Sequence, residues 1–290
     1  MINLLLSVLF TTSLGIILKL FERSKLDVFQ AIVFNYISCV ITGAIVQQSV
    51  PDYINYSKQS WFVYAVILGC SFIFFFNIMG YIVKHMGITV MFVANKLSLV
   101  IPVSAAFFIF HEEATFFKII GILIALLAVV FTSLKEEENK HTFNINQMLW
   151  PILLFAGSGM NDTIVKYAQA FHMHDADNAP FNITIFSAAA ISGGCILIFL
   201  LLTKKSILNF KSIVGGLLLG IPNYFSMHFL IKALSIQGYG SSVIFPLNNI
   251  GVVAASAIIA LLFFHEKLSK LNIIGIALAI LSIVIIAFSA

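Results

Sequence analysis

The segment Phe110-His-Glu-Glu-Ala-Thr-Phe-Phe-Lys-Ile-Ile-Gly-Ile122 recurs later in the chain as Phe264-His-Glu-Lys-Leu-Ser-Lys-Leu-Asn-Ile-Ile-Gly-Ile276. The Phe-His-Glu triplet and the Ile-Ile-Gly-Ile block are both repeated at the same offset of 154 residues, with no gap between them. Residues 105–134 and 259–288 are identical at 11 of 30 positions. Apolar segments share residues easily, but a polar His-Glu pair at a fixed offset is much harder to obtain by chance. The sequence therefore predicts an internal duplication.

The front parts of the two copies match more weakly, at an offset of 147. Four residues are shared there: Ile17, Lys19, Phe34 and Asn35 correspond to Ile164, Lys166, Phe181 and Asn182. The order and the similar offset extend the duplication over the whole chain. We expect a first repeat in residues 1–134, a polar linker in 135–146 and a second repeat in 147–290.

The composition is that of a membrane protein. Of 290 residues, 60% are hydrophobic and only 10% are charged, whereas a soluble domain has about 25% charged residues. The charges collect between apolar runs that are long enough for a bilayer, which needs about 20 residues per helix. Ten such runs are expected: Ile2–Leu20, Val28–Gln47, Trp61–Val83, Ile88–Phe110, Phe117–Leu134, Met148–Ala168, Phe181–Leu202, Ile213–Leu234, Ser241–Phe264 and Leu271–Ala290. They leave no room for a large soluble catalytic or nucleic-acid-binding module.

These runs are expected to be helices. Every backbone polar group inside lipid needs a partner, and the runs are too long and too uniformly apolar for barrel strands. The expected fold is thus all-α, with ten transmembrane helices in two five-helix repeats. Because five is odd, the second repeat enters the membrane in the opposite sense, and inverted repeats of this kind place a solute site near the midplane. Pro102, Pro222 and Pro246 should kink three helices, either towards a cavity or as ordinary packing kinks.

The duplicated blocks resemble the ends of the five-helix repeats of the drug/metabolite transporter superfamily, in its EamA-type, ten-helix branch. The resemblance implies a ten-helix bundle around a central cavity and secondary active transport of a small metabolite or drug, often by proton exchange. It implies no cofactor. The alternatives are an uptake transporter of the same fold for a sugar, nucleoside or amino acid, a channel, and an intramembrane enzyme. No HExxH or GxSxG signature is present, and the chain is not expected to be an enzyme.

Charged residues inside a predicted span are costly and are functional hypotheses by default. Lys96 lies near the middle of the fourth run and Asp162 in the second half of the sixth. Lys96 is expected to anchor an anionic group of a substrate or to carry a coupling proton. Alternatively, Lys96 and Asp162 neutralise each other, or Asp162 pairs with Lys166 one helical turn later.

Amide side chains form a second group of candidates. We expect the solute cavity to be lined by Asn77, Asn95, Asn223, His228, Asn248 and Asn249. Asn95 and Asn249 are equivalent at the offset of 154. For Asn35 and Asn182 we expect hydrogen bonds between helices instead, which contribute only about 0.6 kcal/mol each in membrane proteins.

Several other features have simpler explanations. The loop His172-Met-His-Asp-Ala-Asp177 has no ligand spacing of a known site, so no metal site is expected. Glu112 and Glu266 should lie at the interface and help to start the helices that follow them. Gly193-Gly194 and Gly215-Gly216 should permit close helix contacts. Three cysteines in apolar runs support neither a disulfide nor a zinc site.

We expect a multi-pass protein of the cell membrane, a monomer or homodimer, with a small molecule as partner, protons as the candidate coupling ion, and no nucleic acid. Eleven Lys and Arg residues lie in or beside the odd-numbered loops and four on the other side. The positive-inside rule therefore places both termini outside, whereas the resemblance places them inside.

Overall fold

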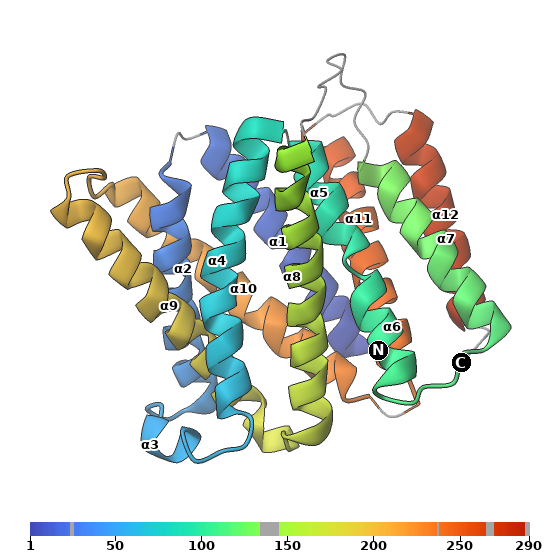
Figure 1. Ribbon diagram of the computed structural model, residues 1–290, viewed down its shortest axis with the longest axis horizontal. Coiled ribbons are helices and arrows are strands. Elements are labelled where there is room, and N and C mark those ends of the chain that lie inside the picture. Colours follow the sequence, from blue (N-terminus) through green and yellow to red (C-terminus); the bar gives the residue numbers. More distant parts are fainter. Residues whose placement is uncertain (24–25, 87, 134–144, 237, 265–269, 288–290) are drawn as a thin grey trace. The chain divides into compact units, whose positions relative to one another are not determined.

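The computed structural model describes residues 1–23, 26–86, 88–133, 145–236, 238–264 and 270–287. The described residues form α-helices and one short 3-10 helix (Figure 1). Their bounds are α1 Ile2–Arg23, α2 Val28–Gln47, α3 Tyr53–Tyr56, α4 Phe62–Met86, α5 Ile88–Leu97, α6 Val100–Phe108, α7 Phe116–Ser133, α8 Ile145–Phe171, η1 Asp175–Asp177, α9 Asn178–Leu202, α10 Phe210–Leu234, α11 Ser241–Phe264 and α12 Lys270–Ala287. The prediction of an all-helical chain is confirmed for these residues, and α2 and α11 have the predicted bounds. Most of the predicted linker lies outside the described residues.

The fourth predicted run differs from expectation, because it is divided into α5 and α6. Ser98 and Leu99 form a turn between them, with hydrogen bonds from Leu99 N to Lys96 O (3.3 Å) and from Ile101 N to Ser98 O (3.0 Å). The break places Pro102 in the first turn of α6, where a missing N–H leaves no helical hydrogen bond unmade. Pro222 and Pro246 instead lie inside α10 and α11, and Pro151, which the sequence reading overlooked, lies inside α8.

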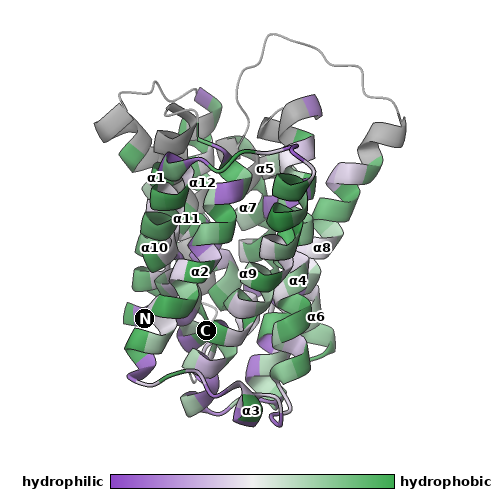
Figure 2. Cartoon of the chain, turned by 90° about the vertical axis from the view of Figure 1, so that its left-hand side faces the viewer, coloured by the Kyte–Doolittle hydropathy of each residue, from purple (hydrophilic) through white to green (hydrophobic). Residues whose placement is uncertain are grey.

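Four described helical segments are long and apolar enough to cross a bilayer: Val28–Gln47, Phe62–Ile82, Asp175–Leu202 and Phe210–Leu234. Hydrophobic residues cover most of the helix surfaces in Figure 2. Large apolar side chains are also widely exposed, as in Ile191 (67%) and Leu202 (79%) on α9. Such extensive apolar surface is costly in water, and it suits helices that contact lipid.

The chain divides into two compact units, each of which combines segments from both predicted repeats. The first unit holds Met1–Phe74 and Ile164–Ser235, and the second holds Phe75–Thr163 and Ile236–Ala290. In the first unit, α10 packs on α1 and α2, and α2 packs on α9. In the second, α12 packs along α7 (Figure 1), and α11 packs on α6 and α7.

Small residues let the helices of the first unit approach closely. A Cβ atom added to Gly216 of α10 would overlap the main-chain oxygen of Ala31 on α2, and one added to Gly193 would lie 2.8 Å from Ile73 Cδ1. A Cβ atom on Gly194 would meet nothing within 4 Å. Close contact is therefore confirmed at Gly193 and Gly216, but the prediction is wrong for Gly194.

Gln30 ties α2 to the connection between α9 and α10. Its amide nitrogen donates to Ser206 Oγ (2.9 Å) and to the carbonyl of Ile207 (2.7 Å), and its amide oxygen accepts from Asn209 N (2.9 Å). The side chain also donates to the N-cap residue Asp27 (3.0 Å) and is fully buried. The buried amide of Gln30, with all these partners, therefore holds the start of α2 next to the start of α10.

Replacing Gln30 by alanine should therefore destabilise the protein by about 0.5–1.5 kcal/mol, because it removes the hydrogen bonds of a buried side chain whose partners are half-buried or exposed. The measurement is thermal unfolding of the purified protein in detergent. Gln59→Ala, at an exposed position, is the matched control. Equal melting temperatures for the two variants would contradict the assigned role of Gln30.

Candidate functional site

The strongest candidate site lies in the second unit, where α5 meets α11. Lys96, in the last turn of α5, donates from Nζ to Asn249 Oδ1 on α11 at 3.2 Å. A cation is favoured at this end of a helix, because the last carbonyl groups carry partial negative charge. The lysine is half-buried. The structure thus brings together two residues predicted for the site that are 153 positions apart.

Asn95 connects the same helix to α8. Its amide nitrogen donates to Ser158 Oγ at 3.0 Å. Asp162 follows Ser158 by one helical turn and so lies on the same side of α8. Lys96 and Asp162 attract each other electrostatically. The residues Asn95, Lys96, Ser158, Asp162 and Asn249 therefore form a polar cluster on three helices, and Ser158 is the member that the sequence reading missed.

Asn248 adds an unsatisfied acceptor to this region of α11. Its side chain is buried (8% exposed), and its Oδ1 atom has no hydrogen-bond partner among the described residues. Buried polar atoms are rarely left without a partner. The atom is therefore available to a water molecule or to a polar solute.

Asn77 belongs to the same unit, on α4, and its side chain is exposed. Its predicted place in a cavity stays a prediction.

The other two predicted cavity residues, Asn223 and His228, belong to the first unit. Asn223 donates to Asn35 Oδ1 at 3.1 Å and so joins α10 to α2. The prediction of an interhelical bond for Asn35 is confirmed. Asn182 differs, because its amide nitrogen donates within α9 to Asn178 O and Oδ1, both at 2.9 Å. His228 is buried, stacks on Tyr224, and has no hydrogen-bond partner for Nδ1 among the described residues.

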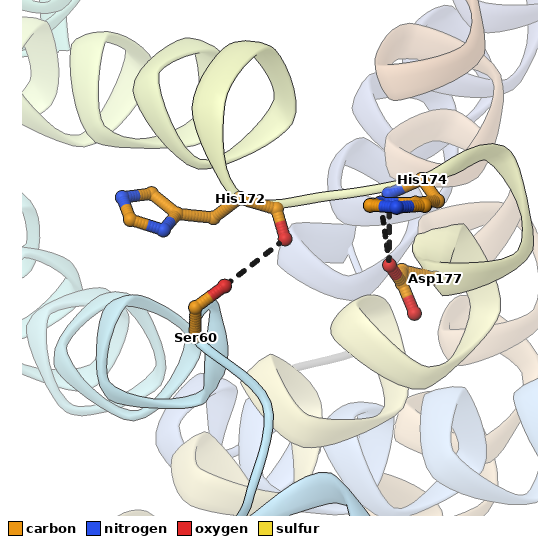
Figure 3. Close-up of polar contacts among 4 residues, drawn as sticks. All are labelled: Ser60, His172, His174 and Asp177. Carbon is orange, nitrogen blue, oxygen red and sulfur yellow. Dashed lines mark hydrogen bonds and ion pairs between the residues drawn. The ribbon is translucent and has the colours of Figure 1, made fainter.

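The histidine-rich loop after α8 does not converge on a metal. Figure 3 shows the ring of His172 pointing away from His174 and Asp177. That ring packs on Tyr64 (4.8 Å between centroids), while the His172 carbonyl accepts a bond from Ser60 Oγ (3.3 Å). Within the described residues, no group of three potential ligands is close enough to hold a metal ion.

Glu112 has a different partner from the one predicted. Its carboxylate caps the start of α11 rather than that of α7, the helix that follows it in the sequence. It accepts hydrogen bonds from the main-chain N–H groups of Ser241 (2.6 Å) and Ser242 (3.1 Å), at the start of α11, and from both serine hydroxyls. Burial alone would raise the pKa of Glu112, but the hydrogen bonds from Ser242 and Ser241 outweigh burial and lower it.

This lowered pKa predicts a pH-dependent contribution to stability. The ionised Glu112 stabilises the folded state at neutral pH, and this contribution is lost as the pH falls below the ordinary carboxyl value of about 4.3 and through the lower folded value. The melting temperature of the native protein should therefore exceed that of Glu112→Gln at pH 7. The difference should shrink towards zero on acidification, and a difference that grows in acid would contradict the assignment.

Known proteins resemble this chain over nearly its whole length. No protein-family model matches it. A curated but uncharacterized protein of Haemophilus influenzae is 29% identical over 287 residues, which are 97% of this chain and 96% of the relative. A solved crystal structure matches with a TM-score of 0.76 and 13% identity, covering 100% of this chain and 96% of the other. That likeness shows a shared fold and carries no function with it.

Proposed function

We propose that this protein is a secondary active transporter for a small polar solute, with ten transmembrane helices in two inverted five-helix repeats. On this proposal it is a multi-pass protein of the cell membrane, and its resemblance is to the EamA-type branch of the drug/metabolite transporter superfamily. Export of a metabolite or drug is the favoured direction, and uptake is the alternative.

Packing within each unit supports the inverted repeat. Three contacts join a helix to its counterpart in the other repeat: α2 to α9, α6 to α11, and α7 to α12. In a structure with a two-fold relation between repeats, counterpart helices that lie near the axis must contact each other. Asn35 and Asn182, equivalent at the offset of 147, are both buried.

The hydrogen bond from Lys96 to Asn249 is the observation that carries the proposal. It joins a residue of the first repeat to a residue of the second, and both lie on apolar helices. A lysine in such a helix costs about 2.5–3.5 kcal/mol to insert. A solute that binds Lys96, either in place of Asn249 or beside it, would explain why a costly charge is present at this position.

The chemistry of the cluster indicates the class of solute. Lys96 presents a cation, and Asn95 and Ser158 add neutral polar groups. Asn248, next to Asn249 in the sequence, adds an acceptor that has no partner among the described residues. This set suits a small polar solute with an anionic group such as a carboxylate. Asp162, near the lysine, provides a carboxylate that could take up a coupling proton when the solute binds Lys96.

Flux into proteoliposomes tests the proposal. Purified protein should transport members of a panel of labelled amino acids, sugars and organic acids with saturable kinetics, and a pH gradient should change the rate. Flux that rises linearly with concentration and does not respond to the gradient would favour a channel. No flux for any member, with the protein folded, would count against transport of these solute classes.

A further inference from the structure

The loop between α6 and α7 holds the start of α11 through one side chain. The first residues of a helix have N–H groups without intrahelical partners. In α11 these belong to Ser241 and Ser242, and both donate to the carboxylate of Glu112. Gly240, which precedes them and accepts from Val243 N (3.0 Å) and Ile244 N (3.1 Å), has no side chain that could cap the helix itself. The cap therefore comes from a residue about 130 positions away.

The chain before α11 and the chain after α6 both have features that permit this contact. A Cβ atom on Gly240 would overlap the carboxylate of Glu112, so a glycine is needed at this position for the carboxylate to reach the helix. On the other side, the main-chain N–H of Glu112 donates to Ala106 O of α6 at 3.1 Å. His111 adopts a φ of 52°, which is uncommon for a residue other than glycine and turns the chain at this point. The main chain of Glu112 is thus bonded to α6, and its carboxylate is bonded to the start of α11.

We propose that Glu112 is a positioning residue, which clasps the first turn of α11 to the end of α6 and so places Asn248 and Asn249 in register with Lys96. Asn248 and Asn249 lie seven and eight residues after Ser241 on the same helix. α11 is continuous over these two turns, with Pro246 inside it, so we expect a shift or fraying of its first turn to move these amides. The link to Lys96 rests on the proposed transport function, whereas the clasp itself does not.

The duplication does not repeat the serine hydroxyls that Glu112 contacts. The offset of 154 relates Glu112 to Glu266 and Ser242 to Ile88, the first residue of α5. Glu266 lies outside the described residues, and the proposal concerns Glu112 alone.

Hydrogen exchange in the purified, full-length protein tests the clasp without any transport assay. Glu112→Gln replaces one acceptor oxygen by a donor group, so the amides of Ser241 and Ser242 should exchange about tenfold faster or more. Gly240→Ala, which displaces the carboxylate while leaving it charged, should have the same effect. Glu113→Gln, an exposed carboxylate in the same loop, should leave the exchange unchanged. Unchanged exchange in both Glu112→Gln and Gly240→Ala would overturn the clasp.

A double-mutant cycle on transport tests the positioning role. If Glu112 acts through Asn249, Glu112→Gln should raise the half-saturating solute concentration about three- to tenfold, and Asn249→Ala should add little to it in that background. Additive effects of the two substitutions would overturn positioning, because residues that act as a unit are not additive. If the native protein transports nothing, the proposed function fails, and the exchange experiment still decides whether the clasp exists.

Discussion

Lys96→Ala is expected to lower the saturable flux of the solute about 10- to 100-fold. A hydrogen bond to a charged group contributes about 1.5–3 kcal/mol, and each 1.4 kcal/mol corresponds to a factor of ten. In the proposed site the lysine makes this kind of bond to the solute, and it alone supplies positive charge in the cluster on α5, α8 and α11. Initial rates in proteoliposomes, at equal amounts of reconstituted protein, measure the loss.

The matched control is Lys211→Ala, which removes an exposed lysine from the start of α10. It should leave the flux within about twofold of the native value, because an exposed charge near a helix end contributes less than about 1 kcal/mol. Unchanged flux in Lys96→Ala, with affinity and response to a pH gradient also unchanged, would remove the central site from the proposal.

Asp162→Asn separates two roles of the acidic residue. If Asp162 only neutralises Lys96, the variant should be destabilised, because it leaves the half-buried lysine without its partner. If Asp162 carries a coupling proton, the variant should still exchange solute between the two sides but should no longer respond to a pH gradient. Counterflow at equal pH, compared with flux driven by a gradient, distinguishes the two outcomes.

The sequence predicted most helix bounds within a few residues, because long apolar runs separated by short polar segments indicate where helices begin and end. It also named both Lys96 and Asn249, through the cost of a charge in a span and through the repeat. It did not predict the break at Ser98 and Leu99, because a turn of two residues leaves the hydropathy of the run unchanged.

Partners distant in the sequence were the least predictable part. Glu112 follows α6 and precedes α7, so local rules assigned it to α7. Its actual partner, the start of α11, is set by the packing of α11 on α6. The same holds for Asn223, whose bond to Asn35 depends on how closely α10 approaches α2. A pattern along one chain indicates which side chains need partners, but the packing of helices decides which partners they find.

That close approach of α10 to α2 leads to the largest stability effect that we expect. Gly216 faces the main chain of Ala31, and four residues later a Cβ atom on Gly220 would lie 2.5 Å from the carbonyl oxygen of Asn35. Between them, Ser38 Oγ donates to the carbonyl of Leu217 at 2.7 Å. These contacts involve backbone atoms on both helices, so neither side can yield by a simple change of rotamer. The two helices must separate if a methyl group is added.

Gly216→Ala should therefore destabilise the first unit by about 1–3 kcal/mol, the usual cost of forcing an extra carbon into a packed interior. Gly194→Ala in α9 makes the same chemical change where a Cβ atom meets nothing within 4 Å. That variant should be neutral or more stable by up to about 1 kcal/mol, because alanine favours a helix over glycine. Thermal unfolding in detergent should thus give shifts of opposite sign, or a loss in one variant and none in the other. A loss of equal size in both would mean that glycine flexibility, rather than the close contact of α10 with α2, accounts for the effect.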